Sequence, residues 1–139
     1  MRSKAFYLLF LITFVGSLHA RIGEKLEMIQ SRHGAGKEIG EDQVLFTIEN
    51  FDVTITFAKG ISFRETYTTR MENNPEQPPM TDKEVQKLLE IQGNGKSWLK
   101  MKQESEGRIL WSTADGSVFA HFLPKYKCVT FTLSPLLSH

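Results

Sequence analysis

The 139-residue sequence contains a single cysteine, Cys128, and has almost no net charge. One cysteine excludes an intramolecular disulfide framework. With 17 Lys and Arg residues against 16 Asp and Glu residues, the chain lacks the basic excess of an electrostatically driven nucleic-acid-binding protein. We therefore expect no nucleic-acid partner. The content of 40% apolar and 11% aromatic residues also excludes intrinsic disorder for the chain as a whole.

Long apolar runs are absent except for one near the N-terminus. Arg2 and Lys4 precede an apolar run over residues 5–15, and small residues then lead to Ala20. This order is typical of a secretory signal peptide, and the run is short for a membrane span. No cysteine stands directly after it, so we expect no lipid anchor. We expect residues 1–20 to be removed and the mature chain to be secreted or periplasmic, without a membrane span; an uncleaved anchor is the alternative.

Residues 70–80 divide the remaining chain, because three prolines and two asparagines favour neither helix nor strand. A helix is expected on each side of this linker. The first spans residues 23–33 and ends at Gly34. The second begins with a capping box formed by Thr81 and Glu84 and ends at Gly93.

Strands are expected after each helix, beginning with the first half. Residues 51–57 alternate apolar and polar side chains, which indicates a half-buried strand. A two-residue turn at residues 49–50 joins it to the preceding strand. A three-residue loop at residues 58–60 joins it to the next strand and would place Ile55 opposite Phe63.

The second half has a comparable pattern. Asp115 and Gly116 indicate a tight hairpin that places Trp111 opposite Ala120. A four-residue turn over residues 123–126 would then place Ala120 opposite Val129.

The expected fold class is α+β, with one domain over residues 21–139. Two helix-β-β-β halves, residues 22–69 and 81–133, form an antiparallel meander sheet with the helices packed on one face. The pattern leaves open whether the six expected strands form one continuous sheet.

This order of elements resembles the duplicated fold of β-lactamase inhibitor proteins and of small outer-membrane assembly lipoproteins of the SmpA/OmlA type. The matching residues are Gly23, Leu26, Ile29, Gly34 and the strands over residues 44–67, with residues 81–133 matching more loosely. The resemblance implies a non-enzymatic protein-binding module of the bacterial envelope. The lipoproteins' anchor cysteine is missing here, and no partner-binding residue of the family can be carried over. Duplicated helix-plus-meander halves also occur in PepSY-type and cystatin-like inhibitors.

The sheet face opposite the helices differs between the two halves. In the first half it carries threonines and charged residues, whereas in the second it carries Leu110, Phe119, His121, Leu123 and Cys128. A semi-apolar patch with a polar surround often marks a binding surface. We expect Leu110, Phe119, His121 and Leu123 to contact another envelope or secreted protein, or a second copy of the chain. Burial of the patch within the chain is the alternative.

Catalysis is a weaker hypothesis, which depends on Cys128 and His121. The expected register places them directly opposite each other, and a thiol beside an imidazole can become nucleophilic. No third orienting group is visible, so we expect no enzyme; a disulfide from Cys128 to another chain is another use of this thiol.

Metal or cofactor binding is not expected. His33, His121 and His139 have no metal-ligand spacing. A small-ligand carrier remains an alternative, with an aromatic pocket lined by Phe51, Phe63, Tyr67 and Trp98, although such residues are more often core.

Overall fold

A computed structural model describes residues 20–70 and 78–134. The expected signal peptide, apart from Ala20, and linker residues 71–77 lie outside the described residues. The described α-helices and strands are, in chain order, α2 (Leu26–His33), β1 (Lys37–Gly40), β2 (Gln43–Ile48), β3 (Phe51–Ala58), β4 (Ile61–Thr69), α3 (Asp82–Gly93), β5 (Trp98–Gln103), β6 (Ile109–Thr113), β7 (Val118–Leu123) and β8 (Cys128–Leu133). The predicted α+β class is confirmed.

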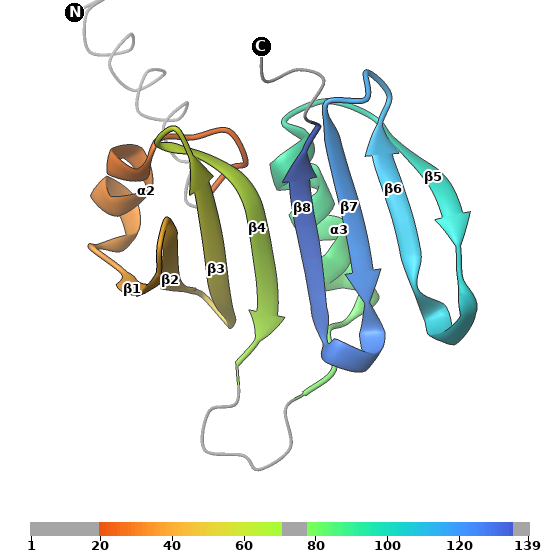
Figure 1. The fold of residues 1–139 in the computed structure, drawn as a ribbon. Helices are drawn as coiled ribbons and strands as arrows, with labels where there is room; N and C mark the ends of the chain where they lie inside the picture. The colour runs from red at the N-terminus through yellow and green to blue at the C-terminus, as the bar shows by residue number, and fades with distance from the viewer. Residues whose placement is uncertain (1–19, 71–77, 135–139) are drawn as a thin grey trace, which may run out of the picture.

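All eight strands form one antiparallel sheet in the order β1-β2-β3-β4-β8-β7-β6-β5 (Figure 1). β4 and β8 lie side by side at its centre, so the strands that follow α2 and those that follow α3 belong to one continuous sheet. The prediction of three strands after each helix was wrong, because β1 and β5 were missed. Both are edge strands with almost entirely exposed side chains, so neither carries the alternation that reveals a half-buried strand.

Both helices pack against the same face of the sheet. Ile29 of α2 and Leu88 of α3 are buried in one hydrophobic core with inward-facing strand residues such as Val53 and Phe131. In Figure 1, α3 lies behind β7 and β8, which leaves the opposite face turned to the viewer. This arrangement confirms the expected packing of the helices.

The helix boundaries follow the predicted signals except at the start of the first helix. In α3 the Glu84 backbone N–H donates to Thr81 Oγ1 at 3.1 Å, and the Thr81 N–H donates to Glu84 Oε1 at 2.9 Å. This reciprocal pair is the predicted capping box. The first helix starts at Leu26 rather than residue 23, and it ends where Gly34 adopts a φ of 87°.

Two of the predicted strand registers are confirmed. β2 and β3 are joined by the two-residue turn at residues 49–50, with Ile48 opposite Phe51. β6 and β7 pair Trp111 with Ala120 across the hairpin that contains Asp115 and Gly116.

The predicted register between β3 and β4 was wrong. The turn has two residues, Lys59 and Gly60, both with positive φ, as a type I′ turn requires. A bulge at Phe63 then shifts the pairing, so that Ile55 lies opposite Glu65 instead of Phe63. The bulge thereby places a carboxylate in the core.

The register between β7 and β8 was also wrong, by two residues. The connection occupies residues 124–127, and Lys127 adopts a left-handed conformation with a φ of 54°. Ala120 therefore lies opposite Phe131 rather than Val129. Because the slip is two residues, every side chain keeps its predicted face.

Candidate functional site

The sheet face opposite the helices is the first candidate site, and we call it the open face. No described helix covers it (Figure 1). Its side chains form cross-strand rows, since paired residues on neighbouring strands point to the same side. One row contains His121, Thr130, Thr66 and Thr54, and the next contains Phe119, Thr132, Arg64 and Thr56.

The four predicted contact residues lie together on this face. Leu110 of β6 is paired with His121 of β7, and Phe119 and Leu123 flank His121 along β7. All four side chains are half-buried. The structure therefore brings these four residues into one patch at the β6–β7 side of the open face.

The rest of the open face carries mainly hydroxyl groups. Threonines from β3, β4 and β8 lie in register, and the Thr66 and Thr130 hydroxyls are 3.1 Å apart within hydrogen-bond distance. The apolar patch and this threonine surface are continuous, because β8 adjoins both β4 and β7.

The structure separates the predicted Cys128–His121 pair. Leu123 lies opposite Cys128, whereas His121 lies opposite Thr130, so the cysteine and histidine are diagonal neighbours. The earlier expectation of direct opposition was wrong because the β7–β8 register is shifted by two residues. Cys128 is buried, and desolvation raises the pKa of its thiol. A raised pKa reduces the fraction of thiolate, which is the nucleophilic form.

Of the four aromatic residues considered for a ligand pocket, Phe51 and Tyr67 are buried in the hydrophobic core and Trp98 packs against it. Tyr67 lies between Phe51 and Phe131 in edge-to-face contacts, with ring centroids 5.9 Å apart in each pair. Trp98 packs on Phe131 instead, and its indole N–H donates to the Leu89 carbonyl at 2.7 Å. Phe63 is half-buried at the bulge. Tyr67 therefore fills the space between two other rings.

A buried polar cluster is the second candidate site, and sequence analysis missed it. Glu65, Tyr67 and Ser62 of β4 and Gln92 of α3 make up this Glu65 cluster. The Ser62 hydroxyl donates to Glu65 Oε2 at 3.0 Å, and the Tyr67 hydroxyl donates to Glu65 Oε1 at 3.1 Å. The Glu65 side chain is 0% exposed, and desolvation, partly offset by these hydrogen bonds, raises its pKa to about 7.

The chain around Ala20 closes the Glu65 cluster. The Ala20 carbonyl accepts hydrogen bonds from the Gln92 side-chain amide at 2.7 Å and from the Tyr67 hydroxyl at 2.9 Å. The Ile22 N–H donates to Gln92 Oε1 at 2.7 Å. Segment 20–22 is thus tied to both the sheet and α3. Alternation with Tyr67 places Glu65 on the core face of β4, but no pattern in the sequence indicated the contacts with Gln92 and Ala20.

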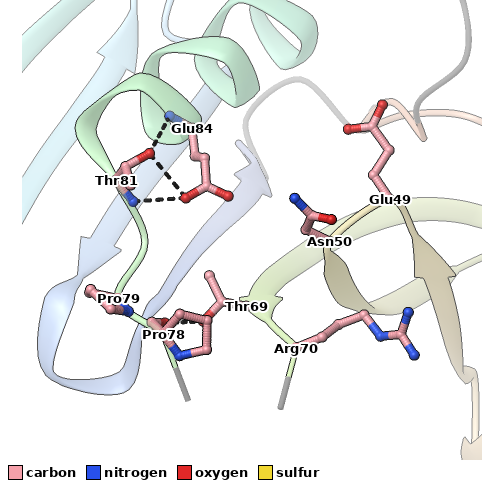
Figure 2. Close-up of a pocket in the computed structure, with 8 residues that line it drawn as sticks. All are labelled: Glu49, Asn50, Thr69, Arg70, Pro78, Pro79, Thr81 and Glu84. Carbon is pink, nitrogen blue, oxygen red and sulfur yellow. Dashed lines mark hydrogen bonds between the residues drawn. The ribbon is translucent and has the colours of Figure 1, made fainter. Parts of the chain in front are cut away.

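A polar cleft of about 410 Å³ lies between the β2–β3 turn, the end of β4 and the start of α3 (Figure 2). The Thr69 hydroxyl donates to the Pro78 carbonyl at 2.7 Å, and the Arg70 N–H donates to the Asn50 carbonyl at 3.0 Å. The first bond links the end of β4 to the residues before α3, and the second links it to the β2–β3 turn. The residues that line the cleft are Glu49, Asn50, Thr69, Arg70, Pro78, Pro79, Thr81 and Glu84. None of them was predicted as a site residue.

Two further observations concern the described part of the chain. It contains no group of three or more His, Cys, Asp or Glu residues placed to hold a metal ion. Among residues 20–70 and 78–134, no helix has the length and apolar character needed to cross a membrane.

Comparisons with protein-family models, with curated proteins and with solved structures found no match.

Proposed function

We propose that this protein is a secreted or periplasmic, non-enzymatic binding module of the inhibitor type, which captures another protein on the open face of its sheet. The observation that carries the proposal is the asymmetry of the sheet. One face is filled by the core and by both described helices, whereas the other holds a half-buried apolar patch without a helical cover.

The composition of the open face suits protein binding. Protein interfaces typically combine an apolar, partly aromatic centre with a polar rim. Here Phe119, Leu110 and Leu123 supply apolar area, while the threonines of β4 and β8 supply hydroxyl groups beside them. A second copy of the chain is an alternative occupant of the same face.

The proposal includes two structural repeats, residues 22–69 and 81–133. The sheet order is symmetric about the β4–β8 junction, and each outer edge strand follows a helix. The four residues Gly34-Ala35-Gly36-Lys37 lead from α2 into β1, and Gly93-Asn94-Gly95-Lys96 lead from α3 towards β5. This shared Gly-x-Gly-Lys pattern supports the proposed duplication.

The non-enzymatic part of the proposal is supported by the state of Cys128. Its thiol is buried, and the expected histidine partner lies on a diagonal position of the neighbouring strand. Export is supported by the N-terminal sequence, in which positive charge, an apolar run and small residues occur in the order of a signal peptide.

The decisive experiment compares two single substitutions on the open face. Phe119→Asp places a charge in the apolar patch, and Thr54→Asp places the same charge on the threonine surface. The wild-type chain and each variant are incubated with an envelope extract and with the culture medium of the source organism. Bound proteins are then cross-linked to the chain and recovered with it. Near-UV circular dichroism shows whether each variant keeps its tertiary packing.

We expect the same partner to be recovered by wild-type protein and Thr54→Asp but lost by Phe119→Asp. Light scattering of the purified chain shows whether that partner is a second copy. Equal recovery by a folded Phe119→Asp variant would disprove the proposed contact surface, and an unfolded Phe119→Asp variant would identify Phe119 as a core residue.

A further inference from the structure

Glu65 is an unusual residue for the interior of this sheet. Ionised carboxylates are rarely fully buried unless a cation pairs with them, because desolvation of the charge is costly. Within the described residues Glu65 forms no ion pair, and its hydrogen-bond donors are neutral: the Ser62 and Tyr67 hydroxyls and the Gln92 amide. The site therefore holds a carboxyl group that must either keep its proton or pair with a cation.

The position of Ala20 indicates where such a cation arises. Ala20 is 0% exposed, and its carbonyl oxygen lies 2.9 Å from the Tyr67 hydroxyl, which is itself 3.1 Å from Glu65 Oε1. Bond lengths across one peptide place the Arg21 nitrogen roughly 2.3 Å from this carbonyl oxygen. The nitrogen of Arg21 thus lies one peptide group from the Glu65 cluster.

We propose that the Glu65 cluster is a binding site for the α-ammonium group of Arg21, created when residues 1–20 are removed. This inference rests on the proposed cleavage after Ala20. Hydrolysis adds water across the Ala20–Arg21 peptide bond, which leaves a carboxylate on the departing Ala20 and an amine on Arg21 that takes up a proton at neutral pH. The hydrolysis is catalysed by a signal peptidase.

Cleavage changes the hydrogen bonding of the cluster in a complementary way. It removes the Ala20 carbonyl, which accepts from Tyr67 and Gln92, and it turns one amide N–H into a group with three donors. The hydroxyl oxygen of Tyr67 and the carboxylate of Glu65 can then accept from the new ammonium group. Hydrogen bonds donated by the ammonium group, which are charge-assisted, thus replace the neutral hydrogen bonds to the Ala20 carbonyl.

The surrounding charges favour a cation at this position. Glu24 Oε1 already accepts from the Arg21 nitrogen at 2.7 Å, and it is paired with the Arg32 guanidinium of α2 at 2.6 Å. The carboxylates of Glu24 and Glu65 thus face the site together with one paired guanidinium. α3 contributes the neutral side chain of Gln92, and β4 contributes the Tyr67 phenol.

The test measures the chemical reactivity of the α-amino group. One chain is prepared with Arg21 as its first residue, and a matched chain keeps His19 and Ala20, which moves the amine away from the site. Both are treated with a limiting amount of an amine-acylating ester near pH 7.5, and the N-terminal peptide is quantified by mass spectrometry. Far-UV and near-UV circular dichroism establish that both chains are folded.

We expect acylation of the Arg21 chain to be about sixfold slower or more, because at pH 7.5 a one-unit rise of an α-amino pKa from about 7.7–8.0 lowers the free-amine fraction roughly six- to eightfold. Glu65→Gln keeps the shape of the side chain and should restore most of the reactivity, whereas Glu24→Gln controls for the more accessible carboxylate. Equal reactivity of the Arg21 chain and the extended chain would overturn the inference. So would a Glu65→Gln variant that remains fully protected.

The N-terminus of the exported protein separates this inference from the proposed processing. The intact mass of the exported protein shows which residue comes first. If that residue is Arg21 but its amine reacts as fast as that of the extended chain, the ammonium site is overturned and the proposed processing stands. A first residue other than Arg21 overturns both.

Discussion

Glu65 lies directly opposite Ile55 in the β3–β4 ladder, inside the hydrophobic core. The pairing exists because the bulge at Phe63 adds one residue to β4 between the turn and Glu65. With the same two-residue turn and no extra residue, the alternation of the strand would place Glu65 on the open face. A single irregularity in the ladder therefore creates the buried Glu65 cluster and its contacts with the chain around Ala20.

The first prediction concerns the pH dependence of stability in a chain that keeps His19 and Ala20. Burial raises the pKa of Glu65 from 4.5 to about 7. Between these values the folded state holds a proton that the unfolded state has released, so the free energy of unfolding falls as the pH rises. The fall is up to about 3 kcal/mol between pH 4.5 and 7, and it levels off above pH 7. Urea unfolding at a series of pH values measures it.

Glu65→Gln is the matched control, because it keeps the size of the side chain and removes the titration. We expect the difference between wild type and Glu65→Gln to grow from pH 4.5 to 7. If both proteins show the same pH dependence over this range, Glu65 titrates normally and the cluster does not hold its protonated form. In a chain that begins at Arg21, pairing of Glu65 with the ammonium group should reduce the pH dependence of the free energy of unfolding.

Local signals in the sequence predicted a large part of the fold. The Thr81–Glu84 capping box depends on residues three apart, and the hairpin around Asp115 and Gly116 depends on turn residues themselves. Both were predicted correctly. The open-face patch was also predicted, since alternation fixes the face of a side chain even when the register slips by two residues, as it does between β7 and β8.

The remaining features depend on tertiary structure. Edge strands β1 and β5 pair on one side only, and their exposed residues show no period of two. The bulge at Phe63 has no glycine or proline to mark it. The Glu65 cluster also needs Gln92, which lies 27 residues further along the chain on a different element. Sequence periodicity carries no information about such contacts.

The second prediction concerns the reactivity of Cys128. Desolvation raises the pKa of its thiol, and the side chain is 7% exposed, so both thiolate formation and access are reduced. We expect alkylation by iodoacetamide at pH 7.5 to be slower in the folded protein than in urea, because burial lowers both the thiolate fraction and the access of the reagent to the sulfur. Fast alkylation of the folded protein would instead favour the thiol-enzyme alternative.

The third prediction contrasts two phenylalanines on opposite faces of the sheet. Phe131 of β8 is 0% exposed and contacts Tyr67 and Trp98 in the core, whereas Phe119 of β7 is half-buried on the open face. We expect Phe131→Ala to lower the free energy of unfolding by about 3–5 kcal/mol, as full burial and a new cavity require.

The matched substitution Phe119→Ala should lower the free energy of unfolding by about 1 kcal/mol or less. The Phe119 side chain already contacts solvent, so its removal leaves no enclosed cavity. Urea denaturation followed by tryptophan fluorescence measures both variants in the same buffer. Comparable losses for the two variants would show that the open face is covered in the folded protein, and Phe119 would then be unavailable to a partner. A small loss at Phe119 beside a large loss at Phe131 would leave the patch free to bind, since its apolar area then contributes little to folding.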